Sequence, residues 1–210
     1  MRGAGRQGTE LTAASPVPRL HLAQQDDADE LLSRDPFALL VGMLLDQQVP
    51  MERAFAGPWV LAQRMDVDRL DPAQVAGVDP ERFAALMAGP PAVHRYHGSM
   101  AGRVQALAAA VVDRYGGDAT RIWADAADGD ALRARLEALP GFGPQKAKIF
   151  VALLGKQLGV RPAGWREAAG EYGPDDATRS VADVRDRDSL AAVRDTKRRL
   201  KAEKKASGRA

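Results

Sequence analysis

The chain has 210 residues, a formal net charge of +2 and no cysteine. A chain without cysteine forms no disulfide, no zinc site built on thiolates and no iron–sulfur cluster. No apolar run is long enough to span a bilayer, and the first residues lack the apolar stretch of a secretory signal. We therefore expect a cytoplasmic protein without a membrane anchor.

The positive charge is concentrated at the C-terminal end. Residues 194–210 carry eight basic and two acidic residues, out of 30 and 28 in the whole chain, so the remainder is net negative. A protein whose main part is net negative can bind nucleic acid there only through a local basic surface. The basic segment itself has two interpretations, which are nonspecific attraction to DNA and a solvated helix end.

Apolar residues recur at helical spacing along most of the chain, and no segment alternates as a strand does. The sequence therefore predicts an all-α fold. We expect a disordered leader at residues 1–18, one helical domain at 19–193 and a basic tail at 194–210. The predicted helices cover residues 26–33, 36–48, 51–65, 96–115, 120–126, 130–138, 144–154, 165–169 and 180–205, with short helices within 66–86.

Two of these helices have marked local signals. Asp35 followed by Pro36 is the pattern of an N-cap residue with proline at the first helical position. Gly57 and Pro58 lie inside the helix predicted for residues 51–65, which either continues through them or breaks there.

The turn at residues 139–144, Leu-Pro-Gly-Phe-Gly-Pro, is the most informative motif. Gly141 and Gly143 can take backbone angles that are closed to other residues, and neither places a side chain before an incoming ligand. The free amides of the turn and of the following helix would point outward and hold a phosphate, with Lys146 and Lys148 adding charge. The alternative is an ordinary corner between two helices.

The segment 139–147 resembles the hairpin of the helix-hairpin-helix DNA glycosylases, which include endonuclease III. A second resemblance lies upstream, where residues 35–41 and 44–48 are similar to an early helix of that family. The helix around residues 99–115 occupies the position of the family's helix before the hairpin. The resemblance spans about residues 35–170 and keeps the family's order.

The resemblance implies a two-lobed helical fold whose hairpin unit covers residues 131–155. It implies a monomer that binds double-stranded DNA carrying a damaged or mismatched base and flips that base out of the helix, so the protein would act at the nucleoid. Gln48 would fill the gap left by the flipped base, or else be a solvated helix end. No cofactor is required, although the family leaves room for a monovalent cation at the hairpin.

Two departures from the family's pattern concern the chemistry. The family's bifunctional members carry a lysine in the hairpin that forms a Schiff base, and Gln145 stands at that position, with Lys146 one place later. We therefore expect no lyase activity. The family's aspartate is also missing from residues 159–167, where Glu167 is the nearest carboxylate. Glu167 is either a catalytic substitute or a surface residue, while capping or solvation accounts for Asp46.

Two further segments allow both a functional and a structural interpretation. Trp165 beside Arg166 could stack on an extruded base or pack as core against the hairpin helix. His94 and His97 have the spacing of a metal pair, but without further ligands we expect an ordinary surface segment and no metal site.

The sequence thus favours a monofunctional DNA glycosylase. The alternatives are a noncatalytic lesion sensor on the same scaffold and, third, a helical protein-interaction module. Glu167 and Gln145 are the candidate catalytic positions. The residues that we expect to contact DNA are Gln48, Gly141, Phe142, Gly143, Gln145, Lys146, Lys148, Trp165 and Arg166.

Overall fold

The computed structural model describes residues 18–207. This part of the chain contains eleven α-helices, two 3₁₀ helices and no strand, which confirms the all-α prediction. The predicted leader lies outside the described residues, apart from Pro18.

The helices follow one another along the whole described part of the chain. They are α1 (Asp26–Arg34), α2 (Pro36–Leu45), α3 (Met51–Met65), α4 (Pro72–Gly77), α5 (Pro80–Ala88), α6 (His97–Tyr115), α7 (Arg121–Ala124), α8 (Gly129–Glu137), α9 (Pro144–Gln157), α10 (Trp165–Ala169), η1 (Gly170–Tyr172), η2 (Val181–Asp183) and α11 (Arg187–Ser207).

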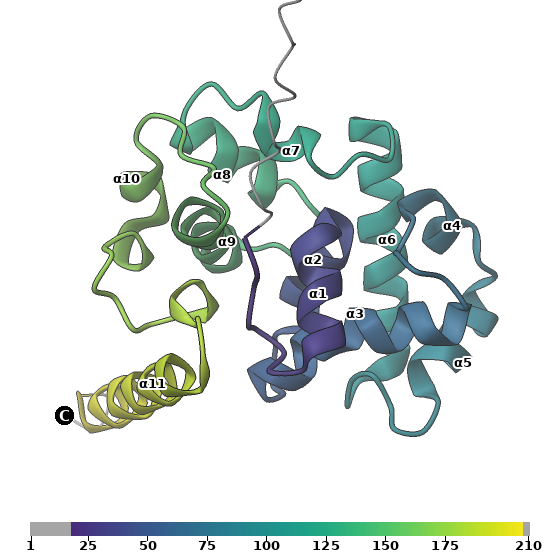
Figure 1. Cartoon of the computed structure of the whole chain (residues 1–210), viewed down its shortest axis with the longest axis horizontal. Helices are drawn as coiled ribbons and strands as arrows, with labels where there is room; N and C mark the ends of the chain where they lie inside the picture. The colour runs from purple at the N-terminus through teal and green to yellow at the C-terminus, as the bar shows by residue number, and fades with distance from the viewer. Residues whose placement is uncertain (1–17, 208–210) are drawn as a thin grey trace, which may run out of the picture.

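Helix α2 forms the centre of the molecule. Every residue from Phe37 to Leu45 is buried, as expected for a helix that is apolar on all sides. Asp35 caps it as predicted, accepting hydrogen bonds from the amides of Phe37 (3.0 Å) and Ala38 (3.1 Å). Figure 1 shows α1 and α2 between two groups of helices, with α4, α5 and α6 on one side and α8, α9 and α10 on the other.

Helix α3 runs without a break through Gly57 and Pro58, which confirms the predicted helix and decides for its continuous form. The reason is tertiary packing. A Cβ atom at Gly57 would lie 2.7 Å from Cδ1 of Leu45 and 3.0 Å from Cγ1 of Val93, so the helix packs closely against its neighbours at this point. Burial of that contact outweighs the backbone hydrogen bond that Pro58 cannot make.

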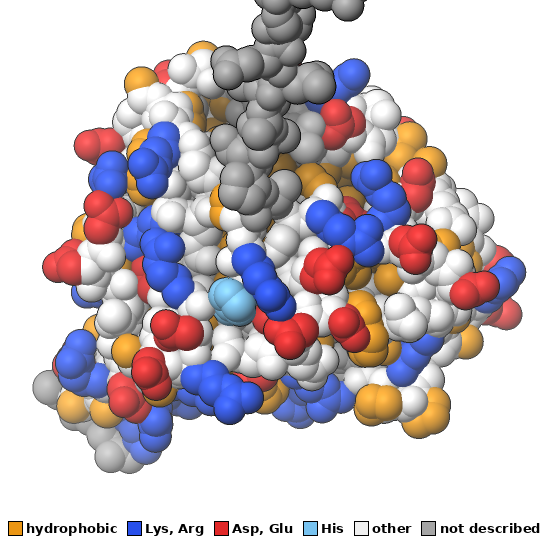
Figure 2. Space-filling view, in the orientation of Figure 1, with side chains coloured by type: hydrophobic (Ala, Val, Ile, Leu, Met, Phe, Trp, Pro, Cys, Tyr) orange, Lys and Arg blue, Asp and Glu red, His pale blue; other side chains and the backbone are white. Residues whose placement is uncertain are grey.

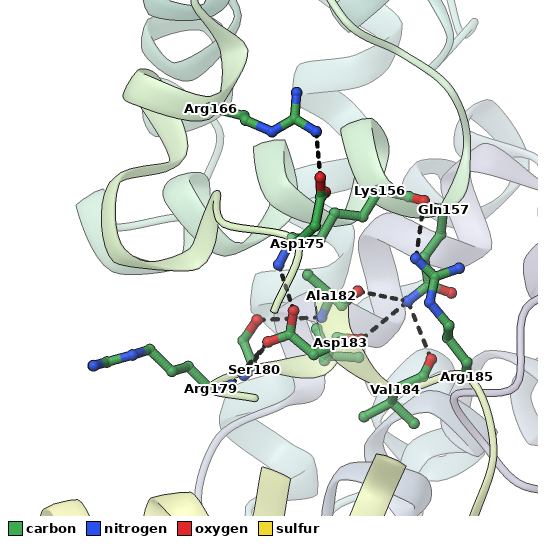
Figure 3. Close-up of polar contacts among 11 residues, drawn as sticks. Lys156, Gln157, Arg166, Asp175, Arg179, Ser180, Ala182, Asp183, Val184 and Arg185 are labelled. Atoms are coloured by element: carbon green, nitrogen blue, oxygen red, sulfur yellow. Dashed lines mark hydrogen bonds and ion pairs between the residues drawn. The ribbon is translucent and has the colours of Figure 1, made fainter. Parts of the chain in front are cut away.

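The prediction of one helix over residues 180–205 was wrong. The chain forms η2 first and begins α11 at Arg187. Ser180 and Asp183 form a capping box, and the carboxylate of Asp183 also accepts a hydrogen bond from Nζ of Lys156 at 2.5 Å. Figure 3 shows how Lys156 and Gln157 of α9 reach this segment.

Helix α11 continues across the boundary expected at residue 194. Leu190, Val193 and Thr196 of this helix are buried, whereas residues 201–207 are all exposed. Residues 201–207 of the basic segment are thus the exposed end of a helix whose first half packs on the body. On the face drawn in Figure 2, acidic and basic side chains are interspersed over the body.

Candidate nucleic-acid interface

The turn between α8 and α9 is closed by its own contacts. The amide of Phe142 donates to the carbonyl of Leu139 (3.1 Å), and the ring of Phe142, only 3% exposed, meets Phe150 edge-on with 5.9 Å between the ring centroids. Gly141 has φ +80°, a conformation that favours glycine. Phe142 therefore holds the hairpin together from inside and presents no side chain to a ligand.

The start of α9 presents open backbone amides. Ala147 is the first residue of the helix whose amide bonds back, to the carbonyl of Gly143 (3.0 Å). Among the described residues, no acceptor engages the amides of Gly143, Gln145 and Lys146. Free amides at the positive end of a helix dipole have the chemistry that suits an anion such as a phosphate.

Gly143 keeps this site open, although not for the reason expected from the sequence. Its φ of −78° and ψ of 175° are extended backbone that any residue adopts, so only Gly141 needs the freedom of glycine. A Cβ atom at Gly143 would meet no atom within 4 Å. The space beside the free amides is therefore open to a ligand.

The two lysines that follow the turn do not both lie beside the amides. Nζ of Lys146 turns inward and donates to the carbonyls of Met43 (2.7 Å) and Leu44 (2.6 Å) at the end of α2. Burial lowers the pKa of Lys146 to about 8, although Asp46 nearby opposes the shift. Lys146 therefore caps a buried helix end instead of offering a free charge to a phosphate, which corrects the expectation for this residue.

Lys148 is two residues further along α9 and so lies on nearly the opposite side of the helix, which faces η1. Its Nζ is 3.7 Å from a carboxylate oxygen of Glu171, and its side chain is one-third exposed. The positive charge of Lys148 is thus partly neutralised within the protein. It remains accessible at the flank of the hairpin.

The hairpin packs directly on the end of α2. A Cβ atom at Gly141 would lie 2.2 Å from Cδ1 of Leu44, so the two segments approach as closely as a glycine allows. Together with the hydrogen bonds of Lys146, this contact brings the turn to the segment 46–50 that links α2 and α3. The turn at residues 139–144 and the segment 35–48, about 100 residues apart in the chain, are therefore neighbours in space.

Gln48 is exposed at this link and has a left-handed backbone, with φ +56°. This conformation is strained for a residue other than glycine, and such strain collects at functional positions. Oε1 of Gln48 accepts a hydrogen bond from the hydroxyl of Tyr96 (3.2 Å). Arg103 of α6 donates to Oε1 of the neighbouring Gln47 (3.3 Å).

His94 supports this link from inside the protein, and the surface position expected for it was wrong. Its side chain is fully buried. The amide of Tyr96 donates to Nδ1 (3.0 Å), so Nε2 carries the proton and donates to the carbonyl of Gln47 (2.9 Å). A neutral histidine with both nitrogens satisfied is a structural brace for Gln48. Within residues 18–207, no group of three or more His, Asp or Glu side chains is arranged to hold a metal ion.

Asp46 is a carboxylate at the same place that the sequence alone did not single out for chemistry. It follows the last residue of α2 and lies near Lys146 and Lys197. Burial raises its pKa, while the two lysines lower it and Glu52 raises it. The signal in the sequence was its place two residues before Gln48, which is also the place of an ordinary helix end.

Glu167 and Gln145, the two candidate catalytic positions, are not brought together. The segment before Glu167 packs at the start of α8, where the amide of Gly129 donates to the carbonyl of Ala163 (2.7 Å). That end of the hairpin helices is opposite to the turn, and Glu167 is exposed there. Gln145 is exposed beside the free amides, and its Nε2 donates to the hydroxyl of Tyr172 (3.1 Å).

Trp165 packs in the core against α9. It is not exposed as a base-stacking residue would be. Trp165 is only 5% exposed, and a Cβ atom at Gly155 of α9 would lie 2.3 Å from its ring. The guanidinium of Arg166 covers the ring at 4.5 Å from a centroid and also binds Asp175 at 2.7 Å. Both faces of the indole are therefore occupied by the protein.

Within the described residues, no helix combines the length and the apolar composition needed to cross a membrane. The chain matches no protein-family model, and a search of curated proteins finds none similar to it in sequence.

Proposed function

We propose that this protein binds double-stranded DNA at a damaged or mispaired base and removes that base as a monofunctional DNA glycosylase. One observation carries the proposal. The free amides of Gly143, Gln145 and Lys146 lie beside the link that holds Gln48 exposed in a left-handed conformation. A phosphate-binding helix end next to a protruding polar side chain suits a protein that anchors one strand and enters the base stack.

The two parts have different roles in this proposal. The amides bind a backbone phosphate and carry no sequence information, because every nucleotide offers the same phosphate. Gln48 takes the place of the base that leaves the stack, and its brace by Tyr96 and His94 keeps it in position. The two-lobed glycosylase arrangement, a monomeric state and action at the nucleoid are parts of the same proposal.

We further propose that the protein leaves an abasic site without cutting the strand. Gln145 stands where a Schiff-base lysine would be needed, and an amide nitrogen cannot form that bond. Lys146 lies one position away and donates to two carbonyls of α2, so its nitrogen is directed away from the open amides.

The proposal is tested with duplexes that each carry a single damaged or mispaired base. Incubation with the protein, followed by alkali, converts an abasic site into a strand break that a gel resolves. We expect breaks for one class of lesion after alkali, none before it, and no covalent adduct after borohydride reduction. A broad set of lesions that stays intact at stoichiometric protein would overturn the enzymatic proposal.

A second candidate function is a noncatalytic lesion sensor on the same scaffold. It is favoured by the position of Glu167, which is exposed at the end of the hairpin helices remote from the turn. A sensor binds abasic or gapped duplex more tightly than intact duplex and releases it unchanged. Equal affinity for all these duplexes would exclude the sensor.

A further inference from the structure

Asp46 lies at the junction of the hairpin, the Gln48 link and the C-terminal helix. It caps α2, with its amide bonded to the carbonyl of Gly42 (3.1 Å). Lys146 of α9 and Lys197 of α11 attract its carboxylate, and Glu52 of α3 repels it. Three elements distant in sequence thus place charged groups around one carboxylate, two residues before Gln48.

Asp46 is half-buried, and its carboxylate lacks the partners that the buried aspartates Asp29 and Asp35 have. Asp35 accepts three backbone hydrogen bonds, and Asp29 accepts one from the amide of Ala23 (2.7 Å). No hydrogen bond or ion pair of the Asp46 side chain is found among the described residues. The half-buried carboxylate therefore stays available to a ligand at the point where the hairpin meets the Gln48 link.

We propose that Asp46 is the catalytic carboxylate of the glycosylase, facing the sugar of the flipped nucleotide in place of the aspartate missing after the hairpin. This inference rests on the proposed function. Two observations favour Asp46 over Glu167. Asp46 adjoins Gln48 and the hairpin turn, whereas Glu167 is exposed at the opposite end of the hairpin helices.

The step is a hydrolysis and needs no reagent other than water. The bond between C1′ of the sugar and the base nitrogen breaks, and its electron pair leaves with the base, which takes a proton from solvent. The ionised carboxylate of Asp46 stabilises the positive charge that develops on the sugar. A water molecule then adds to C1′ and gives a proton to Asp46, which returns it to solvent.

The neighbouring charges suit this role. Burial raises the pKa of Asp46, and the positive charges of Lys146 and Lys197 offset part of that rise. The result is a half-buried carboxylate with two cations near it. Such a group interacts with a developing positive charge more strongly than a solvated carboxylate does.

The experiment compares the wild type with Asp46→Asn, Asp113→Asn and Glu167→Gln on the duplex that the lesion survey identifies. Asp113 is an exposed aspartate near the end of α6 and serves as the matched control. Two quantities are measured for each, the single-turnover excision rate and the dissociation constant for an abasic duplex. Melting temperatures check folding, and Asp46→Ser is the second variant at the site.

We expect Asp46→Asn to excise at least about 100-fold more slowly while binding abasic duplex no more weakly, with Asp113→Asn unchanged in both. Excision by Asp46→Asn and Asp46→Ser at the wild-type rate would overturn the role of Asp46 and leave the proposed function intact. A loss of excision confined to Glu167→Gln would also overturn the role of Asp46 and leave the proposed function intact. A wild type that binds abasic DNA but excises nothing would overturn both the role and the enzyme, and a wild type that binds no DNA would overturn the proposed function itself.

Discussion

Helix α9 has a lysine near each end, and each lysine lies near an aspartate. At the C-terminal end, Lys156 and Asp183 form an ion pair at 2.5 Å, and their side chains are 2% and 4% exposed. The other oxygen of Asp183 accepts hydrogen bonds from the amides of Arg179 (2.8 Å) and Ser180 (3.0 Å), as Figure 3 shows. Both carboxylate oxygens of Asp183 are therefore bonded within the protein.

At the N-terminal end the charges are arranged differently. Lys146 donates to backbone carbonyls instead of to Asp46, and both side chains have pKa values shifted toward their neutral forms by burial. The amides beside them are free. The C-terminal end of α9 is thus closed, because its charges are paired within the fold. The N-terminal end is open, because its amides remain available for a ligand.

The largest effect is expected at the closed end. Lys156→Met leaves Asp183 buried without its cation, and we expect the free energy of unfolding to fall by about 3–5 kcal/mol. Urea unfolding measures the change. The control is Lys148→Met, whose half-exposed pair with Glu171 should cost less than about 1 kcal/mol. Equal losses in the two variants would contradict the contrast between a buried and an exposed pair.

The next effect concerns the two glycines of the turn. Gly141→Ala forces a side chain into a left-handed backbone and against Leu44, and we expect a loss of about 2–4 kcal/mol. Gly143→Ala meets open space and should cost about 1 kcal/mol or less. Thermal unfolding checks both values. DNA binding should nevertheless weaken in Gly143→Ala, because the new methyl group occupies space beside the free amides.

Lys146 should give the stability a pH dependence of about 3 kcal/mol. Its pKa is lowered from 10.5 to about 8 in the folded state, so between these values the unfolded chain holds more protons. Stability therefore rises with pH from about 8 to 10.5 in the wild type. Urea midpoints across this range should rise relative to those of Lys146→Met. Parallel curves for the two proteins would show that the lysine is not desolvated.

The smallest effect is expected from Asp46. Its folded pKa is raised above 3.8, so the folded state holds more protons and stability falls as pH rises above that value. Asp46→Asn should therefore melt at a higher temperature than the wild type at pH 7, and the difference should shrink toward pH 4. A lower melting temperature at pH 7 would mean that Asp46 is structural, as Asp183 is.

Much of the fold was readable from local signals. The helix over Trp165–Ala169, the Asp35 cap and the turn at Gly141 follow from residues close together in the chain. Such features depend on backbone preference and capping, which act over a few residues. The same applies to the free amides of α9, because a helix that starts after a glycine must leave its first amides without partners.

The parts that the sequence misjudged or left open depend on distant contacts. Lys146 turns inward because α2 ends in the core, about 100 residues earlier in the chain. Trp165 is buried because Gly155 leaves room for an indole, and His94 is buried because the Gln47 carbonyl needs a donor. No local pattern distinguishes these residues from exposed ones, so their positions required the folded structure.

Amide hydrogen exchange is the most direct measurement of the central claim, that the open end of α9 binds a DNA phosphate. In the free protein, the amides of Gly143, Gln145 and Lys146 have no acceptor and should exchange quickly by NMR. Duplex DNA with one abasic site should slow these three amides while leaving the buried amides near Lys156 unchanged. Unchanged exchange at all three amides with DNA present would contradict the account.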